Sequence, residues 1–128
     1  MSETSTNLRS ALTWFEIPTI DFDRARRFYE AVLETTLNEH PFGSSRIAVF
    51  PYESPGVGGC LDANSASRPS SDGVVIYVDV DGRLDRTLGL IEAAGGRVVV
   101  PKTALPGMGS IAHIIDSEGN RVGLHAMS

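Results

Sequence analysis

Hydrophobic and polar residues alternate along this chain in an order that occurs twice. Residues 14–33 predict a strand, an acidic turn and an amphipathic helix, and residues 74–94 predict the same three features again. Several short β-prone runs, separated by glycine and proline, follow each predicted helix. A repeat of this kind indicates two similar modules whose open sheets need each other.

The first repeat predicts a strand over residues 14–20 and a helix that begins after Asp21, whose carboxylate can accept from the free amides of a first turn. Its apolar residues recur at the spacing of one helical face: Ala25, Phe28, Tyr29 and Val32. Three strands are expected next, over residues 35–39, 46–52 and 57–62, with turns at 40–43 and 54–56.

The second repeat predicts a strand over residues 74–80, and Asp79 and Asp81 are expected to prepare a helix that ends at Gly95. Pro101 is expected to stop the strand that follows. The remaining predicted strands cover residues 97–100, 110–115 and 121–126, and the last two form a hairpin around the turn at 116–119.

Length and composition favour one domain of 128 residues with a net charge of −5. We expect a flexible N-terminus at 1–10 and a single domain over 11–128, with a first module at 11–62, a linker at 63–73 and a second module at 74–128. Scattered arginines argue against a nucleic-acid partner, and the short apolar runs argue against a membrane protein. With no signal-peptide pattern and a single cysteine, Cys60, the cytoplasm is the expected compartment.

Three stretches, FEIPTIDFDRARRFYEAVL, VVIYVDV and EAAGGRVVVPKTALPGMGSIAHIIDSEGNRVGLH, resemble the vicinal oxygen chelate superfamily, which includes glyoxalase I, bleomycin-resistance proteins and extradiol dioxygenases. The resemblance implies an α+β fold in which two βαβββ modules form a curved mixed sheet around a cavity. It also implies a homodimer. Enzymatic members hold one divalent metal through His, Gln or Glu from the first and last strand of each module, and the metal acts as a Lewis acid.

The positions that match those ligands by the resemblance are Trp14, Val74, Gly123 and the neighbourhood of Cys60 in residues 59–61. Because these side chains do not form a metal site, we expect no cofactor. A divalent metal is the alternative, held by His113 and His125 with Glu16 as the carboxylate. The expected ligand pocket comprises Trp14, Glu16, Cys60, Val74, Gly123 and His125.

Several other candidates have a simpler structural interpretation. Cys60 is interpreted as a buried apolar thiol rather than a nucleophile. Tyr77 is interpreted as a core residue, Tyr52 as a phenol that can reach the cavity, and Lys102 as part of an exposed loop. The glycines of residues 105–109 fit turn geometry and lack the following helix of a phosphate-binding loop.

Three functions follow from these observations. The first is a metal-independent protein that binds a planar or apolar small molecule, since Trp14 offers stacking area and no coordination. The alternative is a metal-dependent lyase, isomerase or dioxygenase with displaced ligands, or a metal-free catalyst that uses His125 or Glu16 as general base. The third is a structural dimer with a vestigial cavity. The sequence does not decide whether the protein is an enzyme.

Overall fold

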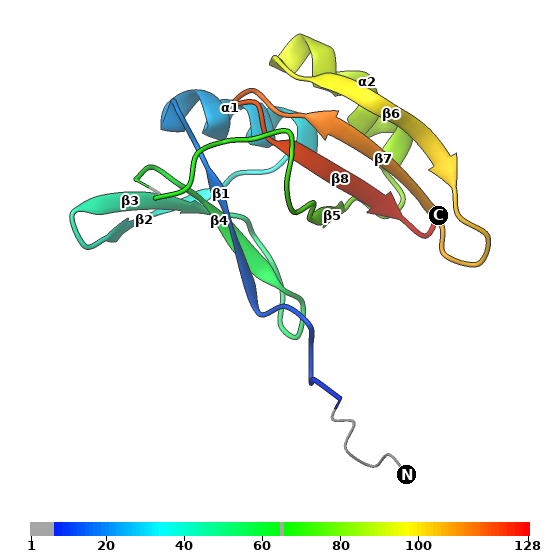
Figure 1. The fold of residues 1–128 in the computed structure, drawn as a ribbon, viewed down its shortest axis with the longest axis horizontal. Coiled ribbons are helices and arrows are strands. Elements are labelled where there is room, and N and C mark those ends of the chain that lie inside the picture. The colour runs from blue at the N-terminus through cyan, green and yellow to red at the C-terminus, as the bar shows by residue number, and fades with distance from the viewer. Residues whose placement is uncertain (1–6, 65) are drawn as a thin grey trace.

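The computed structural model describes residues 7–64 and 66–128, so the predicted flexible N-terminus falls outside the described residues at positions 1–6. The chain repeats one order of elements (Figure 1). These are β1 (Trp14–Pro18), α1 (Phe22–Leu33), β2 (Asn38–Phe42), β3 (Ser45–Val49), β4 (Gly58–Asp62), β5 (Tyr77–Asp79), α2 (Leu84–Ala94), β6 (Arg97–Ala104), β7 (Ser110–Ile115) and β8 (Arg121–Ala126).

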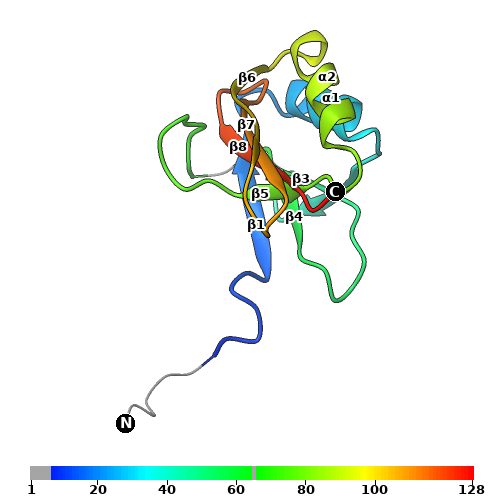
Figure 2. The ribbon, with the colours of Figure 1, turned by 90° about the vertical axis from the view of Figure 1, so that its right-hand side faces the viewer.

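The strands form two four-stranded sheets in the orders β1-β4-β3-β2 and β5-β8-β7-β6. In each sheet the first strand is parallel to the last strand of its module, and the other pairs are antiparallel. This confirms the predicted α+β fold of two βαβββ modules. Both helices lie on the same side of the sheets (Figures 1 and 2), so each sheet has a helix-covered face and a helix-free face.

Side-chain burial follows this arrangement. In β7 and β8 the helix-covered face contains the buried residues Ala112, Ile114, Val122 and Leu124, whereas Ile111, His113, Arg121 and His125 alternate with them and are partly exposed. Helix α1 buries Phe28, Tyr29 and Val32 against the sheets, and the Asp21 carboxylate accepts from the Arg24 amide, as predicted. Among the described residues, neither helix has the length and hydropathy needed to cross a bilayer.

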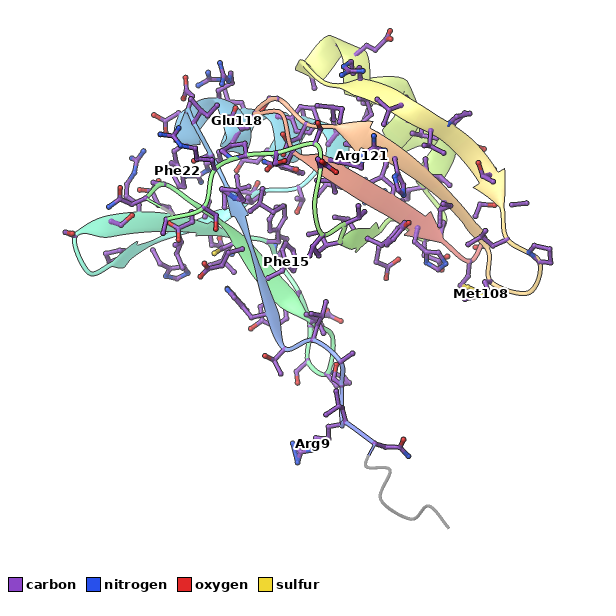
Figure 3. All side chains as sticks on the ribbon, viewed as in Figure 1. Arg9, Phe15, Phe22, Met108, Glu118 and Arg121 are labelled. Carbon is purple, nitrogen blue, oxygen red and sulfur yellow. The ribbon has the colours of Figure 1, made fainter. Side chains whose placement is uncertain are left out.

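The turn between β7 and β8 joins the two modules. The buried Glu118 carboxylate accepts from the backbone amides of Ile20 and Asp21 at 2.8 and 2.7 Å and from Arg24 Nε at 2.7 Å (Figure 3). Burial opposes ionisation of Glu118, but the bonds from Arg24 and the two amides outweigh it and lower its pKa. The second module therefore caps the start of the first module's helix with a charged group.

A second buried contact joins the two modules at the same turn. The Tyr29 hydroxyl donates to Asp116 Oδ2 at 2.6 Å, and Asp116 also accepts from the backbone amides of Glu118 and Asn120 and from Asn120 Nδ2. Burial, and then the charge of Asp116, raises the pKa of Tyr29 far above its ordinary value, so the phenol keeps its proton. Asp116 thus accepts from Tyr29 of the first module and from Glu118 and Asn120 of its own turn.

Strand β5 is shorter than the predicted strand over 74–80. It pairs with β8 only from Tyr77 opposite Gly123 to Asp79 opposite His125. The Arg121 amide, at the start of β8, donates instead to the carbonyl of Ser70 in the connecting segment. Because that segment occupies this edge of β8, Val74 has no strand partner, and 93% of its surface is exposed.

Two predicted strand boundaries were wrong for one physical reason. β2 extends over Pro41, where we predicted a turn, and β6 continues through Pro101, where we predicted a stop. Both strands lie at the edge of their sheet. An edge strand tolerates proline because an amide directed away from the partner makes no ladder bond.

The start of α2 also differs from the prediction. Its N-cap residue is Arg83, which makes no side-chain capping bond, so neither Asp79 nor Asp81 caps this helix. Asp81 Oδ1 accepts instead from the backbone amides of Met127 and Ser128 at 2.6 and 2.9 Å. Asp81 therefore fixes the C-terminal segment. The predicted end of α2 at Gly95 is confirmed, because that residue has a φ of 109°.

Candidate functional site

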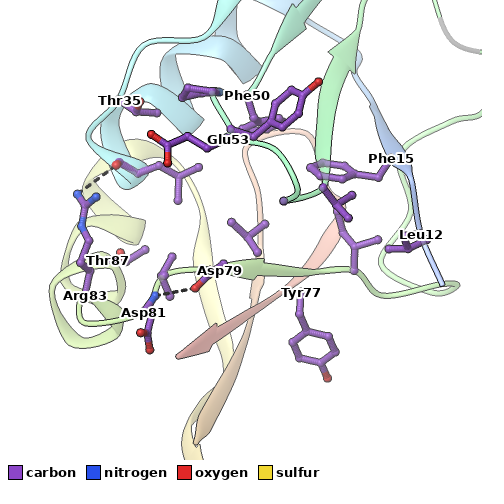
Figure 4. Close-up of a pocket in the computed structure, with 18 residues that line it drawn as sticks. Leu12, Phe15, Thr35, Phe50, Glu53, Tyr77, Asp79, Asp81, Arg83 and Thr87 are labelled. Atoms are coloured by element: carbon purple, nitrogen blue, oxygen red, sulfur yellow. Dashed lines mark hydrogen bonds between the residues drawn. The ribbon is translucent and has the colours of Figure 1, made fainter. Parts of the chain in front are cut away.

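A cavity of about 750 Å³ lies between the two modules (Figure 4). Its walls come from the N-terminal segment and β1, the end of α1, the connection between β3 and β4, β5, and the start of α2. The lining residues are Leu12, Phe15, Leu33, Thr35, Phe50, Pro51, Tyr52, Glu53, Gly56, Val57, Ile76, Tyr77, Val78, Asp79, Val80, Asp81, Arg83 and Thr87. Most are apolar or aromatic, so the cavity suits a molecule with an apolar body.

The polar groups of this cavity lie mainly toward one side. Arg83 Nη2 donates to the Leu33 carbonyl and to Glu34 Oε1, both at 3.1 Å. A hydrogen bond from Arg86, followed by one from Arg83, lowers the pKa of Glu34 to about 2 against the opposing effect of burial. The Arg83 charge is therefore already paired, while Glu53 and Asp79 add carboxylates to the cavity.

Trp14 adjoins the cavity through one lining residue. The rings of Trp14 and Tyr52 pack edge to face with centroids 6.0 Å apart. The Tyr52 ring also covers Gly58, where an added Cβ would lie 2.4 Å from Tyr52 Cε1. The only tryptophan of the chain is thus packed against the cavity wall without itself lining the cavity.

Three of the predicted pocket residues share the helix-free face of the first sheet. The register places Trp14 opposite Gly58 and Glu16 opposite Cys60, and none of these residues lines the cavity. Burial raises the pKa of the Cys60 thiol to about 11. A thiol that keeps its proton at neutral pH is a poor nucleophile, which favours its interpretation as a small apolar residue.

Two further predicted pocket residues, Gly123 and His125, lie on the helix-free face of the second sheet. His113 shares this face, directly opposite Gly123. Val74 lies elsewhere, in the exposed connection. Tyr77 stands opposite Gly123 as Trp14 stands opposite Gly58, so Tyr77 and not Val74 is the counterpart of Trp14 in the second module.

Tyr77 and Lys102 both differ from their interpretation. Tyr77 points away from the core, with 48% of its surface exposed, because the alternation of β5 turns Val78 and Val80 toward the helix-covered side. Lys102 is exposed as expected, but it belongs to β6 rather than a loop, and its Nζ lies 3.1 Å from Asp85 Oδ1.

The positions that the resemblance assigns to a metal, with Tyr77 taking the place of Val74, do not fit one. Trp14 and Tyr77 present aromatic rings there, and a Cβ at Gly123 would lie 2.4 Å from Tyr77 Cδ1, so the ring fills the space of a ligand side chain. The alternative ligands are engaged elsewhere: His113 contacts Tyr77 and Arg121, and His125 Nε2 lies 2.7 Å from the Met108 carbonyl. Within residues 7–64 and 66–128, no three His, Cys, Asp or Glu side chains gather as a metal site.

Sequence reasoning missed most of the cavity wall. Phe15 and Phe50 pack with centroids 5.6 Å apart at the cavity, and Thr87 reaches it from α2. Phe15 alternates with Trp14 and so faces the other side of β1. Strand alternation could have separated these two faces, but only the packing of the modules shows that the side of Phe15 contains the cavity.

Two βαβββ modules with a cavity at their junction define the class of fold to which this chain belongs. Residues 11–124 match the model of the Glyoxalase/Bleomycin resistance protein/Dioxygenase superfamily, and the chain belongs to this family.

Among curated proteins, the chain is 30% identical over 117 residues to the protein named "Putative glyoxylase CFP32" in Mycobacterium bovis and in Mycobacterium tuberculosis. The match covers 91% of this chain and 44% of each relative, so the chain spans less than half the length of these relatives.

Solved structures show the same fold. The fosfomycin resistance protein FosX from Listeria monocytogenes superposes with a TM-score of 0.67 at 17% identity, over 92% of this chain and 91% of that one. A glyoxalase/bleomycin resistance protein from Albidiferax ferrireducens gives a TM-score of 0.66 at 16% identity, over 91% and 98%. UcmS2 gives a TM-score of 0.65 at 24% identity, over 94% of this chain and 100% of that one.

Proposed function

We propose that this protein binds a small organic molecule in the cavity between its modules, and that it does so without a metal ion. The observation that carries the proposal is the cavity itself, whose volume of about 750 Å³ lies within the range of small-molecule sites. Phe15, Phe50 and Val78 offer apolar contact area, while Glu53 and Asp79 can orient polar groups of the ligand.

The side chains at the expected ligand positions support binding without a metal. Trp14 and Tyr77 are aromatic, and Gly123 has no room for a ligating side chain. The alternative is a metal-dependent lyase, isomerase or dioxygenase with displaced ligands. It would require His113 and His125 to leave their present hydrogen bonds and to meet Glu16 from the other sheet.

Names of relatives agree with a role in small-molecule chemistry, since one is called a glyoxylase and another a fosfomycin resistance protein. We further propose a homodimer in the cytoplasm. Trp14, on the helix-free face of the first sheet, is 37% exposed and offers apolar contact area to a second copy. Sedimentation equilibrium tests the dimer, and a monomer at micromolar concentration would contradict it.

The binding proposal is tested with the neutral dye Nile red, whose emission rises in an apolar site. Val57→Phe adds volume at the cavity wall, and Val74→Phe makes the same change at an exposed position outside it. We expect Val57→Phe to weaken dye binding about tenfold, or about 1.4 kcal/mol, and Val74→Phe to leave it unchanged. Equal affinities in the two variants would contradict binding in this cavity.

Two further measurements test the role of Trp14 and the independence from a metal. Trp14→Ala removes the ring that packs on Tyr52, so we expect weaker dye binding. Treatment with ethylenediaminetetraacetate should leave dye affinity unchanged. Chelator-sensitive binding, restored by Zn²⁺ or Mn²⁺, would favour the metal-dependent alternative and direct attention to His113 and His125.

A further inference from the structure

The helix-free face of the second sheet carries a hydrogen-bonded cluster that the proposed function does not use. Tyr77 on β5, His113 on β7 and Arg121 on β8 form it (Arg121 is labelled in Figure 3). The Tyr77 hydroxyl lies 2.7 Å from His113 Nε2, and Arg121 Nη1 lies 3.2 Å from His113 Nδ1. The imidazole therefore connects a phenol to a guanidinium.

Proton placement in this cluster follows from the chemistry of arginine. A guanidinium can only donate, so the contact with Arg121 requires His113 Nδ1 to accept. The neutral imidazole then carries its hydrogen on Nε2 and donates it to the oxygen of Tyr77. The hydroxyl hydrogen of Tyr77 is left to point elsewhere, and within the described part of the chain no second protein group accepts it.

Arg121 differs in its partners from five other arginines of the chain. Arg24, Arg26, Arg46, Arg83 and Arg86 all contact carboxylates. Arg121 instead uses Nε for the Ser71 carbonyl at 3.2 Å and Nη1 for His113, and no carboxylate of the described residues pairs with it. Both of these partners are uncharged, so no described carboxylate pairs with Arg121, and Nη2 and the second hydrogen of Nη1 stay available as donors.

Gly123 makes this arrangement sterically feasible. It lies between His113 and Tyr77 in the register, and the Tyr77 ring lies over it. Arg121 and His125 flank Gly123 on the same face of β8. Asp79, the one carboxylate within the strands of the second sheet, stands opposite His125 at the far side of Gly123 from Arg121. The acidic group is thus displaced along the strand from the cationic one.

We infer that Tyr77, His113 and Arg121 form a binding site for a small oxyanion, a carboxylate or a phosphate. Arg121 supplies the charge and a two-donor fork, and Tyr77 supplies a hydroxyl donor that His113 keeps oriented. The half-exposed Tyr77 ring adds a surface on which an aromatic carboxylate can stack. Tyr77 also borders the cavity, but its ring points away from the other labelled cavity residues (Figure 4), and neither His113 nor Arg121 lines the cavity. The anion site therefore adjoins the cavity and lies outside it.

The test follows the ring signals of His113 by ¹H–¹³C NMR while the full chain is titrated with sodium benzoate or with inorganic phosphate at constant ionic strength. His113→Asn assigns the signal among the three histidines. We expect a saturable shift with at least one of the two anions. Saturation by benzoate alone identifies a carboxylate site, and saturation by phosphate alone identifies a phosphate site. The absence of a saturable shift with both anions would overturn the inference.

Variants separate a built site from general attraction of anions. Arg121→Gln should weaken anion binding at least tenfold, and Tyr77→Phe, which keeps the ring, should weaken it about threefold. Arg97→Gln, at the exposed start of β6, is the control and should change nothing. Arg121→Lys keeps the charge without the fork and should fall between. Equal losses in Arg121→Gln and Arg97→Gln would overturn the inference. Because Nile red reports on the cavity, such a result would leave the proposed function standing.

Discussion

The helix-free faces of the two sheets come from the same repeated module, yet they differ in chemistry. On the first sheet, Trp14 packs on Tyr52 and Cys60 is fully buried with a protonated thiol. On the second sheet, Tyr77, His113 and Arg121 form a polar cluster that is open to solvent. The fold fixes which strand positions face this way, but it does not fix what those positions carry.

The physical basis of this difference is strand alternation. Residues on the helix-covered face must be apolar because both helices pack there, whereas residues on the helix-free face are released from that requirement. Each face begins with an aromatic residue opposite a glycine, Trp14 with Gly58 and Tyr77 with Gly123. From this shared start, one face acquired a buried thiol and the other a cationic hydrogen-bond network.

The largest expected effect concerns Asp116, whose buried hydrogen bonds connect the two modules. Asp116→Ala should destabilise the protein by about 3–5 kcal/mol, because it removes the acceptor of several buried donors. Urea unfolding followed by circular dichroism measures the change. Tyr29→Phe deletes one of these bonds and should cost about 1–2 kcal/mol. A loss in Asp116→Ala no larger than in Tyr29→Phe would contradict the assigned role of Asp116.

Acid should weaken the contact that Glu118 makes with the first module. The folded protein lowers the pKa of Glu118 below its ordinary value of 4.5. The unfolded chain therefore binds a proton more readily than the folded one, and stability should fall as the pH drops below about 4.5. Urea midpoints between pH 7 and pH 3 measure this dependence, with Glu118→Gln as the comparison. An identical pH dependence in Glu118→Gln would show that another group is responsible.

A matched pair of glycine substitutions asks whether the two faces are independent. Gly58→Ala should displace Tyr52, and Gly123→Ala should displace Tyr77, since each added Cβ would lie 2.4 Å from a ring atom. Each should cost about 1–2 kcal/mol. Gly58→Ala should change Trp14 fluorescence and leave the His113 NMR signal unchanged, and Gly123→Ala should do the reverse. Costs that fail to add in the double variant would indicate coupled faces.

The glycine pair needs a reference position. Gly89 lies within α2, and an added Cβ there meets no atom within 4 Å. Gly89→Ala should therefore stabilise the protein by about 0.5–1 kcal/mol, because alanine loses less backbone entropy in a helix. Thermal unfolding measures the change. A destabilisation would mean that the costs at Gly58 and Gly123 do not report ring displacement alone.

The smallest expected effect concerns Cys60 near neutral pH. Since burial raises its pKa to about 11, iodoacetamide should scarcely modify the folded protein at pH 8 and should modify it rapidly in urea. The folded state keeps a proton that the unfolded state releases, so stability should decline as the pH rises from about 9 to 11. Rapid alkylation of the folded protein would contradict the buried position.

The sequence by itself determined the repeated architecture. Alternating apolar residues gave the strands, the spacing of Phe28, Tyr29 and Val32 gave the first helix, and Asp21 and Gly95 marked helix ends correctly. These features depend on neighbours within a few residues, so local physical chemistry is sufficient to predict them. The edge prolines, Pro41 and Pro101, were misjudged because their tolerance depends on where a strand lies in its sheet.

The tertiary structure decided the site. A sequence cannot show that Tyr77 takes the place expected for Val74, because the parallel register of β5 and β8 is set by contacts between segments far apart in the chain. It cannot place Phe15 and Thr87 in one cavity, since that depends on how the modules pack. Nor does it reveal that His113 joins Tyr77 to Arg121. Alternation assigns a residue to a face, and only long-range packing determines which residues meet across it.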